Sequence, residues 1–332
     1  MTVDKDLLVI GGGPGGLSAS IYGSADGLST MVVDSKEVLG GQAGQSSLLE
    51  NVIGFPRGIS GREFIKRAVA QSQKFGTEFR YPVVARQIIR DGNDFLVILS
   101  DSTEVHAKTV VLAPGLSYAP LQAANLEAFM GKGISYGPHR ISNHRKRKLR
   151  AYVVGGANSA GQAAMNLSRR GDACEVIMLV RGAGIRDSMS DYLYKRIVAA
   201  SNIQVWTRTT VVEAQGDRRL RKLVILREGS QEVVEADAMQ IFIGAAPKTD
   251  WLKGIVSLNE RGFIHTGYDL IKDKGLWRFD NRPPFPYETS EAGIWSIGDV
   301  RTTSIKRVGA AAGEGSSVIA RIHEHFHFLS QS

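Results

Sequence analysis

Hydrophobic residues at the start of the chain change their period at a glycine-rich turn. Residues 6–28 predict a strand, the turn Gly11–Gly16 and a helix, because apolar residues after the turn recur at helical spacing. A second strand is predicted over residues 30–34, and this order opens a mononucleotide-binding βαβ unit. The patterns that follow predict a helix at 63–75 ended by Gly76, strand-like alternation over 83–103, and a short buried strand at 109–113.

The same order of patterns begins again at residue 151. It predicts a strand at 151–154, a turn at 155–160, a helix at 162–170 and a strand at 175–180. Residues 233–244 close this second unit, and a further strand at 293–299 and a last helix at 310–328 are predicted. The internal repeat predicts an α/β protein with two Rossmann-like dinucleotide-binding domains.

The first turn carries the residues that a bound dinucleotide needs. Gly11 permits the tight turn, Gly13 lets a pyrophosphate approach the backbone, and Gly16 lets the helix pack closely on its strand. The N-terminus of the helix adds N–H groups and partial positive charge that favour phosphate. Asp34 ends the second strand eighteen residues after Gly16, where an acid binds ribose hydroxyls.

The second turn departs from this pattern. Ala157 replaces the glycine that permits close approach of a pyrophosphate, and Ala160 replaces the helix-packing glycine. The next strand ends at Arg181 rather than at an acid, and Arg186 follows. An acid there favours NAD, whereas arginines pair with the 2′-phosphate of NADPH. We therefore expect NADPH, and the alternative is that both arginines are simply solvated. The expected NADPH residues are Gly155, Gly156, Asn158, Ser159, Ala160, Arg181 and Arg186.

Composition narrows the class of protein further. A chain of 332 residues is long enough for two cores, and no stretch approaches the ~18 apolar residues of a membrane span. Its single cysteine, Cys174, excludes a disulfide framework and fits a reducing cytoplasm. The strand pattern begins too early to leave room for a signal peptide. We expect a cytoplasmic protein without a membrane partner, whose net charge of +8 favours acidic partners or anionic ligands.

The order of these motifs resembles bacterial-type thioredoxin reductases, which belong to the flavoproteins with two dinucleotide domains. The motifs that carry the resemblance are Gly11–Gly16, Gly40-Gly41-Gln42, Glu50-Asn51, Gly155–Ala160, Arg181 with Arg186, and Gly298-Asp299. The resemblance implies three-layer ββα domains in the thioredoxin reductase architecture. It implies an FAD domain at 1–116 and 247–332, an inserted NADPH domain at 117–246, and a homodimer.

The resemblance also implies where FAD would bind. Asp34 would bind the ribose, and Asp299 would hold the ribityl–phosphate region. Residues 306–308 would approach the flavin pyrimidine edge, where a cation and a helix N-terminus stabilise the negative charge of reduced flavin. The implied FAD residues are Gly11, Gly13, Pro14, Gly15, Gly16, Asp34, Ser35, Gly41, Gln42, Asn51, Ala113, Gly115, Gly298, Asp299, Lys306, Arg307 and Val308.

The chain departs from the family at the redox centre. The family has a CxxC pair after Ser-Tyr, whereas this chain has Gly137 and Arg140 at the two cysteine positions. Cys174 cannot replace the pair, because it begins a strand on the far side of the βαβ unit, and we expect a small buried hydrophobic residue. Reduction of thioredoxin by the dithiol route is therefore not expected. The chain is most similar to a dithiol-free branch that is related to the ferredoxin–NADP reductases of this type.

Three hypotheses follow. The first is an enzyme in which NADPH reduces FAD by hydride transfer and the flavin passes electrons directly to an unidentified acceptor. The second keeps FAD without NADPH, in line with Ala157, and takes electrons from a ferredoxin-like partner. The third is a flavin redox sensor without catalysis.

Other features allow both a functional and a structural interpretation. His139 and Tyr136 are weak catalytic candidates, because they lie where the dithiol would face the flavin; packing is the alternative. The basic run 143–150 could dock an acidic carrier such as ferredoxin or flavodoxin, although a solvated face is the simpler interpretation. No nucleic acid is expected, since no aromatic residues accompany the run. No metal site is expected at His323 and His327, and 277–287 is either a packed loop, a flavin cover or a dimer contact.

Overall fold

A computed structural model describes residues 2–46, 48–137, 148–170, 173–272, 275–277 and 282–331. The chain divides into two compact units: unit 1 is Met1–Ser117 with Ala246–Ser332, and unit 2 is Tyr118–Ala245. The short strands β7 (Ser117–Tyr118) and β16 (Ala245–Ala246) pair with each other in the two connections between the units. These connections lie within residues 115–120 and 244–247.

Unit 1 is built on a sheet whose strand order is β3-β2-β1-β6-β5-β4, with β17 also paired to β6. Its strands are β1 (Thr2–Ile10), β2 (Thr30–Val33), β3 (Glu78–Arg80), β4 (Ala85–Asp91), β5 (Asp94–Leu99), β6 (Glu104–Leu112) and β17 (Ile294–Ser296). Its helices are α1 (Pro14–Ala25), α2 (Gly41–Gln45), α3 (Gly61–Lys74), α6 (Tyr268–Lys272) and α7 (Val308–Gln331), with 3₁₀ turns η4 (Asp250–Leu252) and η5 (Gly298–Val300).

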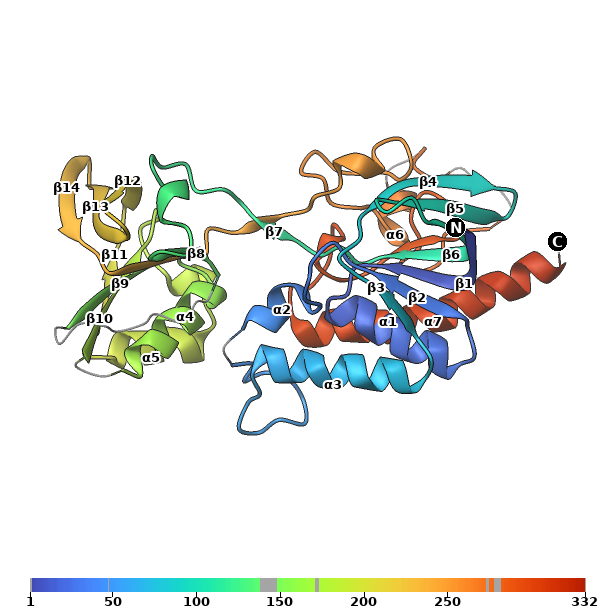
Figure 1. The fold of residues 1–332 in the computed structure, drawn as a ribbon, viewed down its shortest axis with the longest axis horizontal. Helices are drawn as coiled ribbons and strands as arrows, with labels where there is room; N and C mark the ends of the chain where they lie inside the picture. The colour runs from blue at the N-terminus through green and yellow to red at the C-terminus, as the bar shows by residue number, and fades with distance from the viewer. Residues whose placement is uncertain are drawn as a thin grey trace. The chain divides into compact units, whose positions relative to one another are not determined.

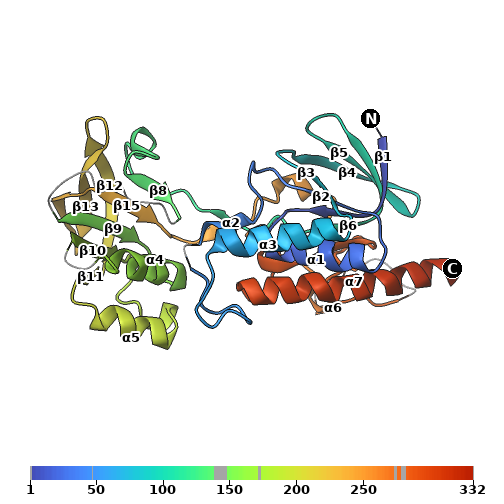
Figure 2. The same cartoon turned by 60° about the horizontal axis from the view of Figure 1, so that its bottom comes forward.

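The carboxyl-terminal halves of β1 and β6 are buried on both faces, which explains why these halves are almost entirely apolar. Alternate residues of β1 enter two different cores. Leu7 and Val9 pack with the helices, whereas Leu8 and Ile10 pack with the β4–β5 hairpin and residues 252–264. Helices α1, α3 and α7 lie together on one face of the sheet (Figure 1, Figure 2). The first residues of the chain and its last helix therefore belong to one folded unit.

Helices α1 and α7 cross at glycine. A Cβ added at Gly315 would lie 2.3 Å from the carbonyl oxygen of Gly15 and 2.8 Å from the Cβ of Ser18. The Ser18 hydroxyl donates a hydrogen bond of 2.7 Å to the carbonyl oxygen of Ala312. The two backbones can approach this closely only because no side chain stands between them.

Unit 2 has a parallel sheet in the order β11-β10-β9-β15-β8 and an antiparallel sheet in the order β12-β13-β14. The strands are β8 (Ile134–Tyr136), β9 (Leu149–Val154), β10 (Cys174–Leu179), β11 (Ile203–Trp206), β12 (Thr209–Gly216), β13 (Leu220–Arg227), β14 (Ser230–Glu235) and β15 (Ala238–Ile241). Helices α4 (Asn158–Ser168) and α5 (Asp191–Ala199) pack on one face of the parallel sheet, and the antiparallel sheet packs on the other (Figure 1). The remaining elements are the 3₁₀ turns η1 (Glu127–Phe129) and η3 (Arg186–Ser188).

This three-layer arrangement confirms the predicted fold class and both βαβ repeats, while several predicted boundaries are wrong. Helix α1 ends at Ala25, because Gly27, with φ +91°, follows its C-cap. Helix α4 begins at Asn158, directly at its glycine turn. The stretch 233–244 is two strands in different sheets, β14 and β15, separated at residues 236–237. Alternation alone does not show that a chain changes sheets. Within the described ranges, no helix combines the length and hydropathy that crossing a membrane requires.

The described part of segment 277–287 is a packed loop. Arg282 forms a bidentate ion pair with the fully buried Glu288, with both N–O distances 2.7 Å. Its guanidinium also lies 4.4 Å from the ring centroid of Phe285. His325, on α7, lies between this ion pair and Trp295, and burial lowers its pKa. The loop therefore secures the C-terminal half of α7 to the sheet.

We predict that the helix crossing makes Gly315 irreplaceable. Gly315→Ala should destabilise the chain by about 1–3 kcal/mol, because the new methyl group meets a backbone carbonyl that cannot turn aside. Gly313→Ala is the matched control on the same helix, since a Cβ there meets nothing within 4 Å. That control should gain about 0.5–1 kcal/mol of helix stability. Urea unfolding followed by circular dichroism measures both, and equal effects of the two substitutions would contradict the prediction.

Candidate functional site

The predicted FAD residues of unit 1, apart from Asn51, lie near the carboxyl ends of the parallel strands. Gly11 follows β1 with φ +115°, and a Cβ there would lie 2.1 Å from the carbonyl oxygen of Ala113, which follows β6. A Cβ at Gly16 would lie 1.8 Å from the carbonyl oxygen of Gly11. Both glycines are therefore required by the packing of the turn itself, as the sequence predicts.

Asp34 lies beside the first turn. One carboxylate oxygen accepts a hydrogen bond of 2.6 Å from the backbone N–H of Gly12, and the other accepts one of 2.8 Å from the backbone N–H of Lys36. A carboxylate has about four lone-pair sites, so two remain to accept ribose hydroxyls. The neighbouring Ser35 is exposed at the same edge.

A second glycine segment lies against this turn. The backbone N–H of Gly40 donates a hydrogen bond of 2.8 Å to the carbonyl oxygen of Gly12, and a Cβ on Gly41 would lie 3.8 Å from the Cα of Gly13. The Gln42 side chain donates to the carbonyl oxygen of Leu116 at 2.8 Å, next to Gly115. Asn51 lies in an exposed loop closed by the Leu49–Ile59 bridge. Within the described residues no hydrogen bond joins Asn51 to the turn.

The first turn leaves space where a phosphate would bind. Gly13 is the N-cap of α1, with φ −79° and ψ −176°, and a Cβ added there meets nothing within 4 Å. No side chain caps the helix, so the N–H groups of its first turn face this open space. A buried helix N-terminus with an empty approach suits an anion, and the turn fits a pyrophosphate.

The C-terminal segment brings a carboxylate and two cations to the same edge. Gly298 and Gly15 both approach Ala311 of α7, so η5 lies beside the first turn. Burial raises the pKa of the Asp299 carboxyl; the Lys306 charge opposes this rise, and Glu314 adds to it. Lys306 donates a hydrogen bond of 3.4 Å to the carbonyl oxygen of Asp299, and with exposed Arg307 it directly precedes α7 at Val308.

Two residues that the sequence analysis gave no role, Arg301 and Glu314, hold this segment. Glu314 accepts hydrogen bonds from the Gly298 N–H at 2.6 Å and from Arg301 Nε at 3.0 Å. Arg301 also donates to the Thr266 hydroxyl at 3.0 Å, and both members of the ion pair are nearly buried. The signal that could have identified them is a glutamate within the small-residue run Ala-Ala-Gly-Glu-Gly of α7. The pair fixes η5 to the helix, and with it the position of Asp299.

The second turn repeats the backbone of the first with one added methyl group. Ala157 is the N-cap of α4 with φ −94° and ψ 179°, close to the values of Gly13. Gly155 has φ +134°, and a Cβ there would lie 2.4 Å from the carbonyl oxygen of Phe242. The fully buried Ala160 stands where the first turn has Gly16. A dinucleotide on this turn must therefore accommodate the methyl group of Ala157.

The loop after β10 carries both predicted arginines and is hydrogen-bonded to the second turn. The Ser188 hydroxyl donates to the carbonyl oxygen of Gly156 at 2.8 Å, and the Asn158 side chain accepts from the Ser190 N–H at 2.8 Å. Arg181 and Arg186 are exposed, and the Arg186 guanidinium lies 5.7 Å from the ring centroid of Tyr194. Exposed guanidinium groups beside such a turn can pair with a 2′-phosphate.

The structure gives Tyr136, one of the two candidates near the missing dithiol, an internal role. The Tyr136 hydroxyl accepts a hydrogen bond of 2.7 Å from the Leu121 N–H, and its ring stacks on Tyr118. Cys174 begins β10 and is fully buried, as predicted, and burial raises the pKa of its thiol. His139, Arg140 and residues 143–147 of the basic run lie outside the described residues.

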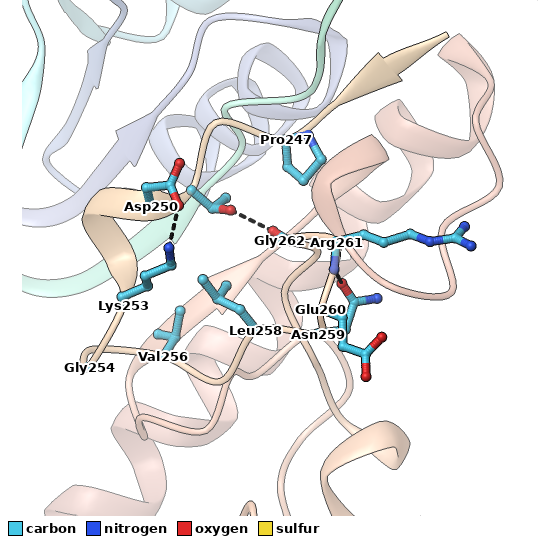
Figure 3. A pocket seen from close by; sticks show the side chains of 11 residues that line it. Pro247, Asp250, Lys253, Gly254, Val256, Leu258, Asn259, Glu260, Arg261 and Gly262 are labelled. Atoms are coloured by element: carbon cyan, nitrogen blue, oxygen red, sulfur yellow. Dashed lines mark hydrogen bonds and ion pairs between the residues drawn. The ribbon is translucent and has the colours of Figure 1, made fainter. Parts of the chain in front are cut away.

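A separate hollow of about 540 Å³ lies in unit 1, on residues 247–262 (Figure 3). Its wall includes the exposed ion pair of Asp250 and Lys253, 2.6 Å apart, and the Thr249 hydroxyl donates to the Gly262 carbonyl oxygen. None of the predicted FAD residues lines it. The hollow is therefore distinct from the glycine turns.

The fold and the two glycine turns define a protein with two dinucleotide-type domains. The family model described as pyridine nucleotide-disulphide oxidoreductase matches residues 5–315. The chain belongs to this family of enzymes. The predicted relation to thioredoxin reductases is confirmed, and the single cysteine is consistent with a lacking CxxC pair.

Several known proteins resemble the chain over nearly its full length. Thioredoxin reductase of Bacillus subtilis is 28% identical over 332 residues, which cover 98% of this chain and 96% of that protein. An alkyl hydroperoxide reductase protein of Xanthomonas campestris is 27% identical, and the match covers 96% of this chain and 57% of that longer protein. The crystal structure of T. acidophilum thioredoxin reductase has a TM-score of 0.80 at 24% identity and covers 97% and 98% of the two chains.

We predict that Gly13→Ala weakens flavin binding without unfolding the protein. The new methyl group has open space and an allowed backbone conformation, so the thermal unfolding temperature of the flavin-free protein should fall only by the small loss of a better N-cap residue. It would fill the approach of the pyrophosphate, and FAD affinity should fall by about tenfold or more, equivalent to about 1.4 kcal/mol. Fluorescence titration of the flavin-free protein with FAD measures this. Unchanged affinity would show that no pyrophosphate approaches Gly13.

Proposed function

We propose that the chain is an NADPH-dependent FAD oxidoreductase that delivers electrons to an acceptor without a protein dithiol. The observation that carries the proposal is the pair of glycine turns in a chain whose single cysteine is buried in the core of unit 2. Two dinucleotide sites suit hydride transfer between two cofactors, and one buried thiol cannot form a dithiol relay. When bound, FAD supplies the hydride acceptor and passes the electrons on.

The residues of unit 1 support FAD as the first dinucleotide. The N-terminus of α1 and the open space at Gly13 receive the pyrophosphate, and Asp34 keeps lone pairs for the ribose. Lys306 and the N-terminus of α7 provide positive charge for a flavin that becomes more negative on reduction. The Arg301–Glu314 ion pair keeps Asp299 beside these groups. All of these groups belong to one folded unit, and fixed groups of this kind favour electrostatic stabilisation.

Unit 2 supports NADPH as the second dinucleotide. Arg181 stands at the end of the second strand of its βαβ unit, where NAD-binding proteins have an acid. Arg186 is exposed on the loop that is hydrogen-bonded to the turn through Ser188. Ala157 is the observation that favours the alternative, a flavoprotein that takes its electrons from a ferredoxin-like carrier. Homodimer formation and an acidic carrier, ferredoxin or flavodoxin, remain part of the proposal.

Anaerobic titration with NADPH and then with NADH tests the proposal. NADPH should bleach the flavin absorbance of the purified protein at far lower concentration than NADH. Arg181→Ala should raise the NADPH concentration required about tenfold and leave NADH unaffected, because one charge-assisted contact to phosphate is lost. Arg218→Ala, which removes an exposed arginine elsewhere in unit 2, is the matched control and should behave as the unsubstituted protein.

Two outcomes of the titration would contradict the proposal. Purified protein that binds no FAD would remove its basis altogether. Flavin that dithionite reduces but neither nicotinamide does would show that the second turn binds no electron donor, and the ferredoxin-like alternative would then stand.

We predict that Ala157→Gly improves the second site. The substitution restores the open approach that Gly13 provides in unit 1, and glycine is a better N-cap than alanine. The KM for NADPH in a ferricyanide assay should fall by at least about threefold, while kcat changes less. The expected fall in KM corresponds to the ~0.8 kcal/mol of free energy that one methyl-sized group contributes. A KM that stays constant or rises would show that the methyl group does not face the nucleotide.

A further inference from the structure

The net charge of the chain is confined to one unit. Unit 2 carries 19 Lys and Arg against 11 Asp and Glu, whereas unit 1 carries 22 of each. The whole excess of +8 therefore lies within residues 118–245. The nucleotide loop accounts for only two of these cations, Arg181 and Arg186, so a dinucleotide does not explain the excess.

The topology gathers most of the remaining cations at the edge of unit 2 that is opposite the second turn. All neighbouring strands of the five-stranded sheet are parallel, so the starts of β8, β9, β10 and β15 share one edge. Four segments at this edge, 131–133, 148–150, 169–170 and 217–222, contain nine Lys and Arg and one Asp. We call them the basic edge.

Contacts between the segments confirm that they are neighbours. The Leu220 N–H donates a hydrogen bond of 3.0 Å to the carbonyl oxygen of Lys132, which joins the β12–β13 turn to the start of β8. Burial raises the pKa of the Cys174 thiol, and the nearby charges of Arg170 and Lys148 oppose that rise. The start of β15, which directly follows the acid Asp237, lies between residues 148–150 and residues 131–133. The basic edge therefore extends from the end of α4 to the β12–β13 turn with this acid between its segments.

Internal pairing explains only part of this charge. Arg150 pairs with Glu175 at 3.0 Å, and Arg221 pairs with Asp217 at 3.1 Å. Among the described residues, no carboxylate lies within ion-pair distance of the exposed Lys132 or Arg218. Like charges within a Debye length of about 8 Å repel each other in the free protein, and a negative partner removes that repulsion.

We propose that the basic edge is a docking surface for an acidic protein. Its four segments contain no aromatic residue on which bases could stack, and its paired carboxylates would repel a phosphate backbone. An acidic protein surface carries many carboxylates and some cations. It can therefore pair with both the many cations and the few acids of the basic edge. The surface shares no residue with either glycine turn. Its binding can therefore be measured separately from electron transfer, although the acidic carrier of the proposed function is one partner that would fit it.

Binding of poly-L-glutamate to the full-length chain tests the surface. The unsubstituted protein should bind the polymer, and binding should weaken as salt is raised. The double variant Lys132→Glu with Arg218→Glu should bind at least about tenfold more weakly, because four units of charge change at the surface. The matched control is Lys66→Glu with Arg86→Glu, which changes the net charge equally on exposed positions of unit 1. This control should bind within about twofold of the unsubstituted protein, since rim charges elsewhere contribute little.

Three results would overturn the inference. Equal weakening in both double variants would show a response to net charge alone. Tighter binding to a duplex DNA oligonucleotide than to poly-L-glutamate at equal salt, lost in the first variant, would make the edge a nucleic-acid surface. Absence of any binding to the polymer would remove the surface altogether. Ferricyanide reduction by NADPH, measured on both variants, reports separately on the proposed function and should not change.

Discussion

The crossing of α1 and α7 is the constraint on which unit 1 depends. Residues from opposite ends of the chain meet there, because a Cβ at Gly315 would lie 2.3 Å from the Gly15 carbonyl oxygen. The N-terminus of α1 carries the first glycine turn, and α7 begins directly after Lys306 and Arg307. The close approach therefore places a phosphate-type turn and a cationic segment at one edge of the sheet. Any side chain at the crossing would separate the two halves of the candidate site.

The electrostatics of this edge follow from the same crossing. Glu314 lies one residue before Gly315 on α7 and reaches the Gly298 N–H and Arg301. Asp299 is held between the negative charge of Glu314 and the positive charge of Lys306, while burial raises the pKa of its carboxyl. A buried ion pair adds little to stability, although it can fix one arrangement among several. Here the ion pair fixes the position of the segment that would face a flavin, and this is its contribution to the site.

Sequence analysis predicts the parts of this structure that follow from local pattern. Both βαβ units, the buried Cys174 and the need for glycine at Gly11 and Gly16 follow from period and spacing. The β12–β14 sheet was not predicted as a separate layer, because alternation does not say which strands pair. Arg301 and Glu314 received no role, since their meaning arises only when η5 and α7 are packed together. Residues 148–150, the end of the basic run, indicated cationic character, but the other segments of the basic edge are brought near them by topology alone.

The two glycine turns share one backbone conformation but differ in the space that they leave for a dinucleotide. In both turns the first glycine accommodates a carbonyl oxygen from a neighbouring strand, and in both the first helical residue follows an extended N-cap. They differ at that N-cap, where Gly13 leaves open space and Ala157 adds a methyl group. A cofactor that stays bound requires close approach of the pyrophosphate, whereas a substrate that must leave after each turnover does not. A second turn that binds its dinucleotide less tightly than the first would therefore suit the proposed resident FAD and exchanging NADPH. Loss of the methyl group would strengthen binding, and beyond a point it would slow release of the oxidised nucleotide.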